Sequence, residues 1–316
     1  MSFLAIEAFI AIVGFILGIS LLIFSSDKAV EHSIKIATTL GISPFIVGLV
    51  LVSIGTDLPE IANSIISSAS DHGDINVGDS LGSVLTQITL VLGLVCLLTK
   101  DFSIKRSEII VPGVCLVLAL MLTVYIIQQG FISRFNAFNI LLSWPLFMIL
   151  IEKLTEKEVK KQFVYVYKPQ FRKDLIIAIL GFVGVAIGAY VLIQSVIRLS
   201  TIFKVSEFFI SFFLVSIGTS LPELIVDLTA IRKKEYELAI GDIIGSCIVD
   251  ATISISIGNL LFPTFISGGL ATITGLYAIF ASIIVITTLT LRNKLDRKAG
   301  IFFIFVYLFS YTMLSF

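Results

Sequence analysis

The stretch Leu51-Val-Ser-Ile-Gly-Thr-Asp-Leu-Pro-Glu60 decides the fold, because the chain contains it twice. The second copy, Leu214-Val-Ser-Ile-Gly-Thr-Ser-Leu-Pro-Glu223, differs only at Ser220, where the first copy has Asp57. Further along, the pattern Gly-Asp-x-x-Gly-Ser also occurs twice, at residues 78–83 and 241–246. Both pairs of motifs are separated by 163 residues, so the sequence predicts two equivalent halves of one fold.

Each copy places a carboxylate, a proline, a glycine and hydroxyl groups within an apolar run. Polar groups inside a membrane span are costly and mark functional sites. Proline lacks an N–H and clashes with the preceding helical turn, so we expect Pro59 and Pro222 to interrupt their helices near Gly55-Thr56 and Gly218-Thr219. Backbone that lacks its helical partner at membrane depth lines cavities, and its carbonyl oxygens coordinate cations. The repeat therefore predicts a cation site.

The composition indicates an all-α membrane protein, since 57% of the residues are hydrophobic and 14% are charged. With about 20 apolar residues per crossing, the sequence predicts ten helices near residues 3–24, 42–69, 76–98, 107–128, 135–152, 174–197, 206–231, 238–262, 267–291 and 299–315. They form two sets of five, residues 1–152 and 174–316, joined by a cytoplasmic linker at 153–173. Five is odd, so the second set must be inverted, and the broken helices are the second and the seventh.

The basic residues predict the orientation. The connections after the first, third, fifth, seventh and ninth helices hold 19 of the 22 lysines and arginines, and the remaining three are Arg134, Arg198 and Lys204. Because cytoplasmic loops are enriched in basic residues, we expect a multi-pass protein of the cell membrane with both termini extracellular.

Two further helices carry polar stripes at a spacing of four residues, which places their members on one helical face. The stripes are Asp79, Ser83 and Gln87, and Asp242, Ser246 and Asp250. The pairs Gly78/Gly82 and Gly241/Gly245 would let these helices approach the broken ones closely. We expect Asp79 and Asp242 in the first helical turn, near the interface, where an acid suits the helix dipole.

Four acids in or beside the motifs, Asp57, Glu60, Glu223 and Asp250, give a ligand set of hard oxygens. Flexible oxygen cages without imidazole or thiolate favour Ca²⁺ over transition metals. The two histidines, His32 and His72, fall in predicted loops, where we expect them to be solvated.

The charge of this ligand set suggests exchange. If all four acids were ionised, one Ca²⁺ would leave a charge of −2 in a low-dielectric interior, so protons or monovalent cations should share the cluster. Ions that compete for the same carboxylates give antiport when the two halves of an inverted repeat alternate in access.

These motifs resemble the cation/calcium antiporter superfamily, and in particular its sodium/calcium exchanger branch of the prokaryotic type. The resemblance covers essentially the whole chain, and it implies a Ca²⁺ site at Glu60 and Glu223. It further implies carbonyl ligands near Ser53, Thr56, Ser216 and Thr219, and sodium sites at positions that are here Ser83, Ser220, Ser246, Gln87 and Asp250. The chain departs from the family pattern at Asp57, which replaces a hydroxyl, and at Gln87, which stands where Asn or Asp is usual. These departures leave the coupling ion open between Na⁺ and H⁺.

We therefore expect a secondary active antiporter that exchanges Ca²⁺ for Na⁺ by alternating access, with a proton/Ca²⁺ antiporter as the alternative. A Ca²⁺ channel or a non-transporting membrane scaffold are alternatives of another class. The expected partners are inorganic cations and the lipid bilayer, with no nucleic acid, no cofactor and no enzymatic reaction.

Overall fold

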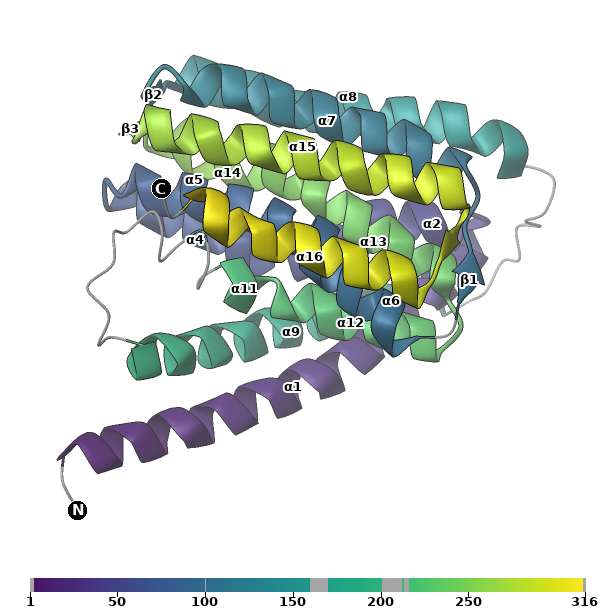
Figure 1. Ribbon diagram of the computed structural model, residues 1–316. Helices are drawn as coiled ribbons and strands as arrows, with labels where there is room; N and C mark the ends of the chain where they lie inside the picture. Colours follow the sequence, from purple (N-terminus) through teal and green to yellow (C-terminus); the bar gives the residue numbers. More distant parts are fainter. Residues whose placement is uncertain (1–2, 100, 160–169, 201–211, 213–215, 315–316) are drawn as a thin grey trace.

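A computed structural model describes residues 3–99, 101–159, 170–200, 212 and 216–314. The described part is almost entirely helical, with four two-residue strands (Figure 1). The distribution of apolar and polar side chains is that of a membrane protein. Large apolar residues such as Leu118, Phe138, Leu180, Phe280 and Phe305 are exposed, whereas many serines, threonines and carboxylates are buried. This distribution suits a lipid surround and a polar interior.

The first half begins with a long helix and continues with a second span that is divided into short pieces. Its elements are α1 (Phe3–Leu40), α2 (Pro44–Val47), the π-helix η1 (Gly48–Val52), α3 (Ser53–Thr56), α4 (Leu58–Ala69), α5 (Gly73–Leu85), η2 (Thr86–Val91), α6 (Leu92–Leu98), β1 (Phe102–Ser103), α7 (Ser107–Ile127), β2 (Phe131–Ile132) and α8 (Arg134–Val159).

The second half follows the same order in the residues that are described. Its elements are α9 (Phe171–Ser200), α11 (Ser216–Thr219), α12 (Leu221–Arg232), α13 (Tyr236–Val249), the π-helix η4 (Asp250–Ser254), α14 (Ile255–Leu261), β3 (Thr264–Phe265), α15 (Gly268–Arg292), β4 (Lys294–Leu295) and α16 (Arg297–Leu314).

Six of the described helices are long and apolar enough to cross a membrane. They span Ile12–Leu40, Gly73–Leu98, Ser107–Ile127, Arg134–Thr155, Tyr236–Leu261 and Gly268–Arg292. The pieces Pro44–Thr56 and Leu58–Ala69 make a seventh span if their 44° bend is counted as a break within one crossing. Residues 201–211 and 213–215, which hold most of the first half of the predicted helix 206–231, lie outside the described residues.

Three ends of the long helices α1, α8 and α9 differ from the prediction. Helix α1 was expected to end near residue 24 but runs on to Leu40. Its charged segment is stabilised by ion pairs along the helix, because Glu31 lies 2.7 Å from Lys35 and 3.6 Å from Lys28. The predicted linker is also shorter, since α8 continues to Val159 and α9 begins at Phe171; residues 160–169 lie outside the described residues.

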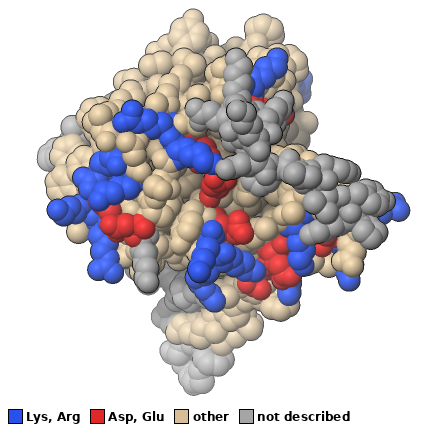
Figure 2. Space-filling view, turned by 90° about the vertical axis from the view of Figure 1, so that its right-hand side faces the viewer, with Lys and Arg blue, Asp and Glu red and all other residues tan. Residues whose placement is uncertain are grey.

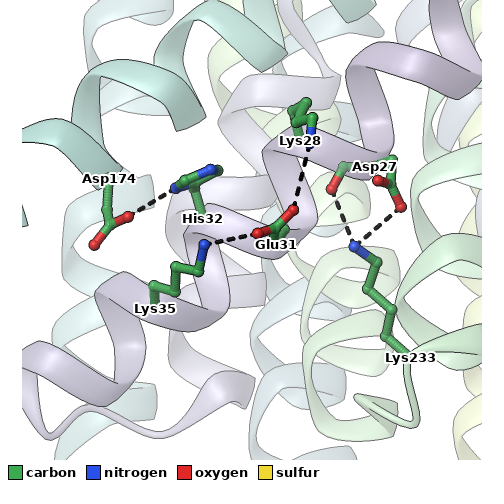
Figure 3. A network of polar contacts seen from close by, with 7 residues as sticks. All are labelled: Asp27, Lys28, Glu31, His32, Lys35, Asp174 and Lys233. Atoms are coloured by element: carbon green, nitrogen blue, oxygen red, sulfur yellow. Dashed lines mark hydrogen bonds and ion pairs between the residues drawn. The ribbon is translucent and has the colours of Figure 1, made fainter.

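Figure 3 shows how this segment of α1 is held. His32 Nδ1 lies 2.8 Å from Asp174 Oδ1 on α9, and Lys233, just after α12, lies 3.0 Å from Asp27. The prediction that His32 is solvated in a loop is therefore wrong, because the side chain is buried on a helix against a carboxylate. His72 is exposed, as expected.

Contacts between connections define the two ends of the bundle. At one end, β1 pairs with β4, and Lys105 lies 2.6 Å from Glu237. At the other, β2 pairs with β3, and Asp74 accepts a hydrogen bond from the backbone N–H of Ser267. Figure 1 shows the first end on the right and the second on the left, and Figure 2 shows lysines and arginines gathered on the first end.

Candidate cation site

The two copies of the repeated motif break their helices in the same way. Asp57 separates α3 from α4 with φ −75° and ψ 6°, and Ser220 separates α11 from α12 with φ −81° and ψ 3°. The break falls one residue later than predicted in each copy. The reason is that the N–H groups of Asp57 and Ser220 still donate to the carbonyls four residues back, at 2.9 and 3.0 Å.

Each break places a glutamate at the start of a new helix. Pro59 and Pro222 are the second residues of α4 and α12, and Glu60 and Glu223 are the third. Proline is tolerated in the first turn of a helix, where its missing N–H leaves no hydrogen bond unmade within that helix. The positive end of the helix dipole favours a carboxylate at this position. Both glutamate carboxylates therefore lie at a helix N-terminus, whose dipole stabilises their negative charge in a dry interior.

The breaks bring three acids together. One carboxylate oxygen from each of Asp57, Glu60 and Glu223 lies within 4.8 Å of the other two, although Glu223 is far from the others in sequence. All three side chains are buried, with 0–1% exposed. Three carboxylates at this separation form a set of oxygen ligands that fits a hard cation.

Five of the six carboxylate oxygens of these acids lack a hydrogen-bond donor. Both carboxylate oxygens of Glu60 and Glu223 are without a partner, as is Oδ2 of Asp57. Among the residues that the structure describes, no lysine or arginine is buried. Buried carboxylates without donors or counter-charges are strongly destabilising, so positive charge from cations or protons must complete the site.

Threonines of the two motifs reach across to the opposite half. Thr56 Oγ1 lies 3.4 Å from Ser246 Oγ and 3.5 Å from Asp242 Oδ1. Thr219 Oγ1 lies 3.3 Å from Ser83 Oγ and 3.2 Å from Asp79 Oδ1. The two sets of contacts are equivalent, because each residue of one set is replaced in the other by the residue 163 positions away. Each motif therefore faces the Gly-Asp-x-x-Gly-Ser pattern of the other half.

The expectation that Asp79 and Asp242 cap their helices near the interface is wrong. Each is the seventh residue of its helix, α5 or α13, and is at most 1% exposed. Asp79 accepts hydrogen bonds from Asn63 and Thr219. The error arises because α5 and α13 begin three and two residues earlier than the apolar runs predict, which places both acids in the second turn of their helices.

The last residues of the two polar stripes lie where the α-helices change to π-helices. Gln87 is the second residue of η2, and Asp250 is the first of η4. Single π-helical turns are frequent at functional sites. Gln87 Nε2 points to Asp57 Oδ1 at 3.5 Å, and Asp250 interacts electrostatically with Asp57 and Glu60. Both oxygens of Asp250 lack a hydrogen-bond donor. The two residues thus border the three-acid cluster from opposite halves.

The remaining predicted residues are also buried, and the carbonyls of Ser53 and Ser216 already accept hydrogen bonds. The carbonyl of Ser53 already accepts from Asp57 N–H at 2.9 Å and lies 3.2 Å from Thr56 Oγ1. The carbonyl of Ser216 accepts from Ser220 N–H at 3.0 Å. Proline at position i frees the carbonyl at i−4, which identifies Gly55 and Gly218 as the carbonyls that lose their donors. Ser220 Oγ has no hydrogen-bond partner.

Glycines allow the halves to meet at backbone distance. A Cβ built on Gly245 would lie 2.5 Å from the Leu49 carbonyl oxygen, and one built on Gly82 would lie 2.3 Å from the Phe212 carbonyl oxygen. Gly241 makes the same kind of contact with Phe45, at 2.2 Å. The predicted close approach of the striped helices to the broken ones is thus observed at these three glycines.

Two polar residues that lie beside the site were not identified from the sequence. Asn63 holds Asp79 at 2.6 Å, and Asp227 is a fully buried acid one helical turn after Glu223. The signal was present, because Asp227 lies at i+4 from a predicted ligand inside an apolar run. The repeat concealed it, since the equivalent residue of the first copy is Ser64.

The chain is similar in sequence and in fold to known membrane proteins. The family model described as "Sodium/calcium exchanger protein" matches residues 10–152 and 173–316. The inner membrane protein YrbG of Escherichia coli is 29% identical over 78% of this chain and 79% of its own length. The sodium/calcium exchanger MaX1 of Methanosarcina acetivorans is 25% identical over 92% of this chain and 95% of its own. A solved structure of the sodium-calcium exchanger NCX_Mj superposes with a TM-score of 0.78 at 25% identity, covering 96% of this chain and 98% of that one.

Proposed function

Because the chain belongs to the sodium/calcium exchanger protein family, we propose that it is a secondary active antiporter that exchanges Ca²⁺ for Na⁺ across the membrane. The observation that carries the proposal is the cluster of Asp57, Glu60 and Glu223, whose ligand oxygens lie within 4.8 Å of one another. The relatives MaX1 and NCX_Mj, both named as sodium/calcium exchangers, support the same cation pair.

The transported ions are substrates of this site. Glu60 and Glu223 bind Ca²⁺ directly, and the backbone around Ser53, Thr56, Ser216 and Thr219 supplies neutral oxygens. Ser83, Ser220, Ser246, Gln87 and Asp250 hold monovalent cations at the edges of the same cluster. Because these ligands share carboxylates with the Ca²⁺ position, binding of one kind of ion displaces the other, which is the requirement for antiport.

The proposed topology has ten crossings in two inverted sets of five, with both termini extracellular. Three observations support it: the 163-residue offset, the crosswise threonine contacts, and the separation of the connections into two ends. The end that carries β1, β4 and Lys233 holds the basic connections and is the cytoplasmic one. An inverted repeat around a central site gives two access states by motion of one part against the other.

A proton/Ca²⁺ antiporter is the second candidate, and Asp57 favours it. This acid stands where the second copy has Ser220, and it adds an ionisable group to a cluster that is closed to water. A carboxylate at this position can carry a proton where the hydroxyl of its twin would bind a sodium ion.

The test is uptake of radioactive Ca²⁺ into vesicles that contain the purified protein. An outward Na⁺ gradient should drive uptake, and an outward proton gradient of equal size should drive less. Uptake driven by protons alone would establish the second candidate. Ca²⁺ flux that needs neither gradient and follows the Ca²⁺ gradient only would indicate a channel, and the absence of any flux would leave a scaffold.

A further inference from the structure

Asp227 and Asp242 form a second acidic pair that the proposed exchange site does not use. Asp227 lies on α12, four residues after Glu223 and therefore on the same helical face. Asp242 lies on α13, which packs against α12. The two carboxylates are near enough to each other and to Glu223 for their charges to repel in this dry interior. Both side chains are fully buried.

This pair lacks the donors that a buried carboxylate requires. Both oxygens of Asp227 and Oδ2 of Asp242 have no hydrogen-bond partner. The remaining oxygen of Asp242 has only long contacts, at 3.4 Å from Ser246 Oγ and 3.5 Å from Thr56 Oγ1. Two neighbouring buried carboxylates without donors repel each other unless a cation or a shared proton lies between them.

The other half of the molecule shows how such an acid is satisfied without an ion. Asp79, the equivalent of Asp242, accepts from the Asn63 amide at 2.6 Å and from Thr219 Oγ1 at 3.2 Å. The equivalent of Asn63 in the second half is Val226, which has no donor. In place of an amide, the second half adds the carboxylate of Asp227. The pair is thus a feature of one half and of one end of the molecule.

The acidic pair lies to one side of the central cluster, toward one end of the molecule. Asp227 lies about 6 Å beyond Glu223 along α12, from four residues at about 1.5 Å each, toward the basic connection that begins at Arg232. We propose that Asp227 and Asp242 form a second cation site, which takes a hard cation, Na⁺ or Ca²⁺, on its way between the central cluster and this end. The inference rests on the proposed function, because it extends the path of the same ions.

Two oxygens from each carboxylate offer up to four ligand atoms, which is fewer than Ca²⁺ prefers and suits transient rather than tight binding. An ion held one turn from the centre also raises the local cation concentration on one side only. We therefore expect an asymmetric effect: loss of Asp227 should weaken cation access from the end of Arg232 and leave access from the opposite end nearly unchanged.

The first experiment measures equilibrium binding of radioactive Ca²⁺, and separately of radioactive Na⁺, to the purified full-length protein. Glu60→Gln removes a central ligand that belongs to the other half, so the cation binding that it retains should reflect the pair. Adding Asp227→Ser, the residue that the first copy has at Ser64, should lower that binding at least about tenfold. Asp71→Asn, which removes an exposed acid at the opposite end, is the control and should change nothing.

Equal binding by Glu60→Gln and by the double variant would overturn the proposal, and it would mean that the two acids share a proton instead. Asp227→Asn keeps the shape of the side chain and answers the same question if Asp227→Ser does not fold. If Asp227→Ser lowers the binding of only one cation, Na⁺ or Ca²⁺, that cation is the one that the acidic pair binds.

The second experiment separates this inference from the proposed function. In vesicles of the two orientations, Asp227→Ser should raise the KM for Ca²⁺ several-fold when Ca²⁺ is supplied at the Arg232 end, and not at the other. Wild-type vesicles that transport no Ca²⁺ would refute the proposed function while the binding result still stands. Normal exchange with an unchanged KM at both ends would refute the second site alone.

Discussion

Replacing Glu60 or Glu223 should remove Ca²⁺ transport and leave the fold of the protein intact. Glutamine keeps the volume of each side chain and removes its charge. Removing one partner from a buried charged cluster costs about 3 kcal/mol or more, which is roughly a 150-fold loss of affinity. We expect Glu60→Gln and Glu223→Gln each to abolish measurable Ca²⁺ transport in vesicles at matched protein levels.

Glu152→Gln is the control for this pair, because Glu152 is exposed near the end of α8. It should transport as the wild type does. Size-exclusion profiles of all three variants should match, since the two buried glutamates make no hydrogen bonds that the fold depends on. Near-normal uptake by either buried variant would remove that glutamate from the site.

Asp57 is the residue at which the two copies of the motif disagree, and it should influence the coupling ion. Asp57→Ser gives the first copy the residue of the second and leaves one fewer acid for protons to bind. We expect Na⁺-driven Ca²⁺ exchange to continue, with a weaker dependence on pH when uptake is measured from acidic to alkaline buffer. An unchanged pH profile with weaker ion affinity would instead identify Asp57 as a permanent ligand.

At the scale of elements, close contact between α13 and η1 and between α5 and residue 212 depends on glycine. Gly82→Ala or Gly245→Ala would place a Cβ 2.3 or 2.5 Å from a backbone carbonyl oxygen, so the neighbouring backbone must move. Such overpacking costs about 2 kcal/mol, and it would also displace the ligands on these helices. We expect a lower midpoint of thermal unfolding in detergent and slower exchange.

Gly269→Ala is the matched control, since nothing lies within 4 Å of a Cβ at that position of α15. Alanine there should leave exchange unchanged and leave the unfolding midpoint equal or slightly higher, because alanine favours helix. Equal behaviour of Gly82→Ala and Gly269→Ala would show that the helices are not in backbone contact.

Helix α16 begins with a charged cap outside the membrane spans. The backbone N–H of Ala299 donates to Asp296 at 2.9 Å, and Arg292 pairs with the same carboxylate. The backbone hydrogen bond and then Arg292 lower the pKa of Asp296 to about 2. Asp296→Ala should lower the free energy of unfolding by about 1 kcal/mol, the usual effect of a lost helix cap.

The lowered pKa of Asp296 also predicts how its contribution to stability changes with pH. The ionised form is favoured in the folded protein, so its contribution is fully present above the unfolded pKa of about 4 and is lost as pH falls toward 2. Thermal unfolding from pH 5 to pH 2 should therefore show a smaller acid destabilisation for Asp296→Ala than for the wild type. Parallel curves would show that the cap does not contribute.

At the scale of the whole molecule, the two ends of the bundle should face different compartments. All three cysteines, Cys96, Cys115 and Cys247, are buried, so their replacement by alanine leaves a background for labelling. In that background, we expect Arg232→Cys to react with a membrane-impermeant maleimide only from the cytoplasmic side. Gln129→Cys, at the opposite end, should react only from outside. Reaction of both from one side would contradict an inverted repeat.

The sequence by itself determined that the protein is helical and apolar, and where the two motif helices break. Apolar run length fixed where helices form, because a membrane span needs about 20 apolar residues. Pro59 and Pro222 fixed the helix breaks to within one residue, because a missing N–H is a local property. The 163-residue offset related the two halves, and all twelve predicted site residues are buried in the structure.

What only the tertiary structure decided depends on contacts between segments far apart in the chain. No local pattern could show that Thr56 faces Asp242 while Thr219 faces Asp79, or that His32 is buried against Asp174. The depth of Asp79 and Asp242 differs from the prediction for another reason, because their helices begin at Gly73 and Tyr236, before the apolar runs. Whether a buried acid is satisfied depends on which donor lies opposite: Asn63 serves Asp79, and no such donor serves Asp227. Spacing places a carboxylate on a helical face, but packing of the opposite half decides what that face meets.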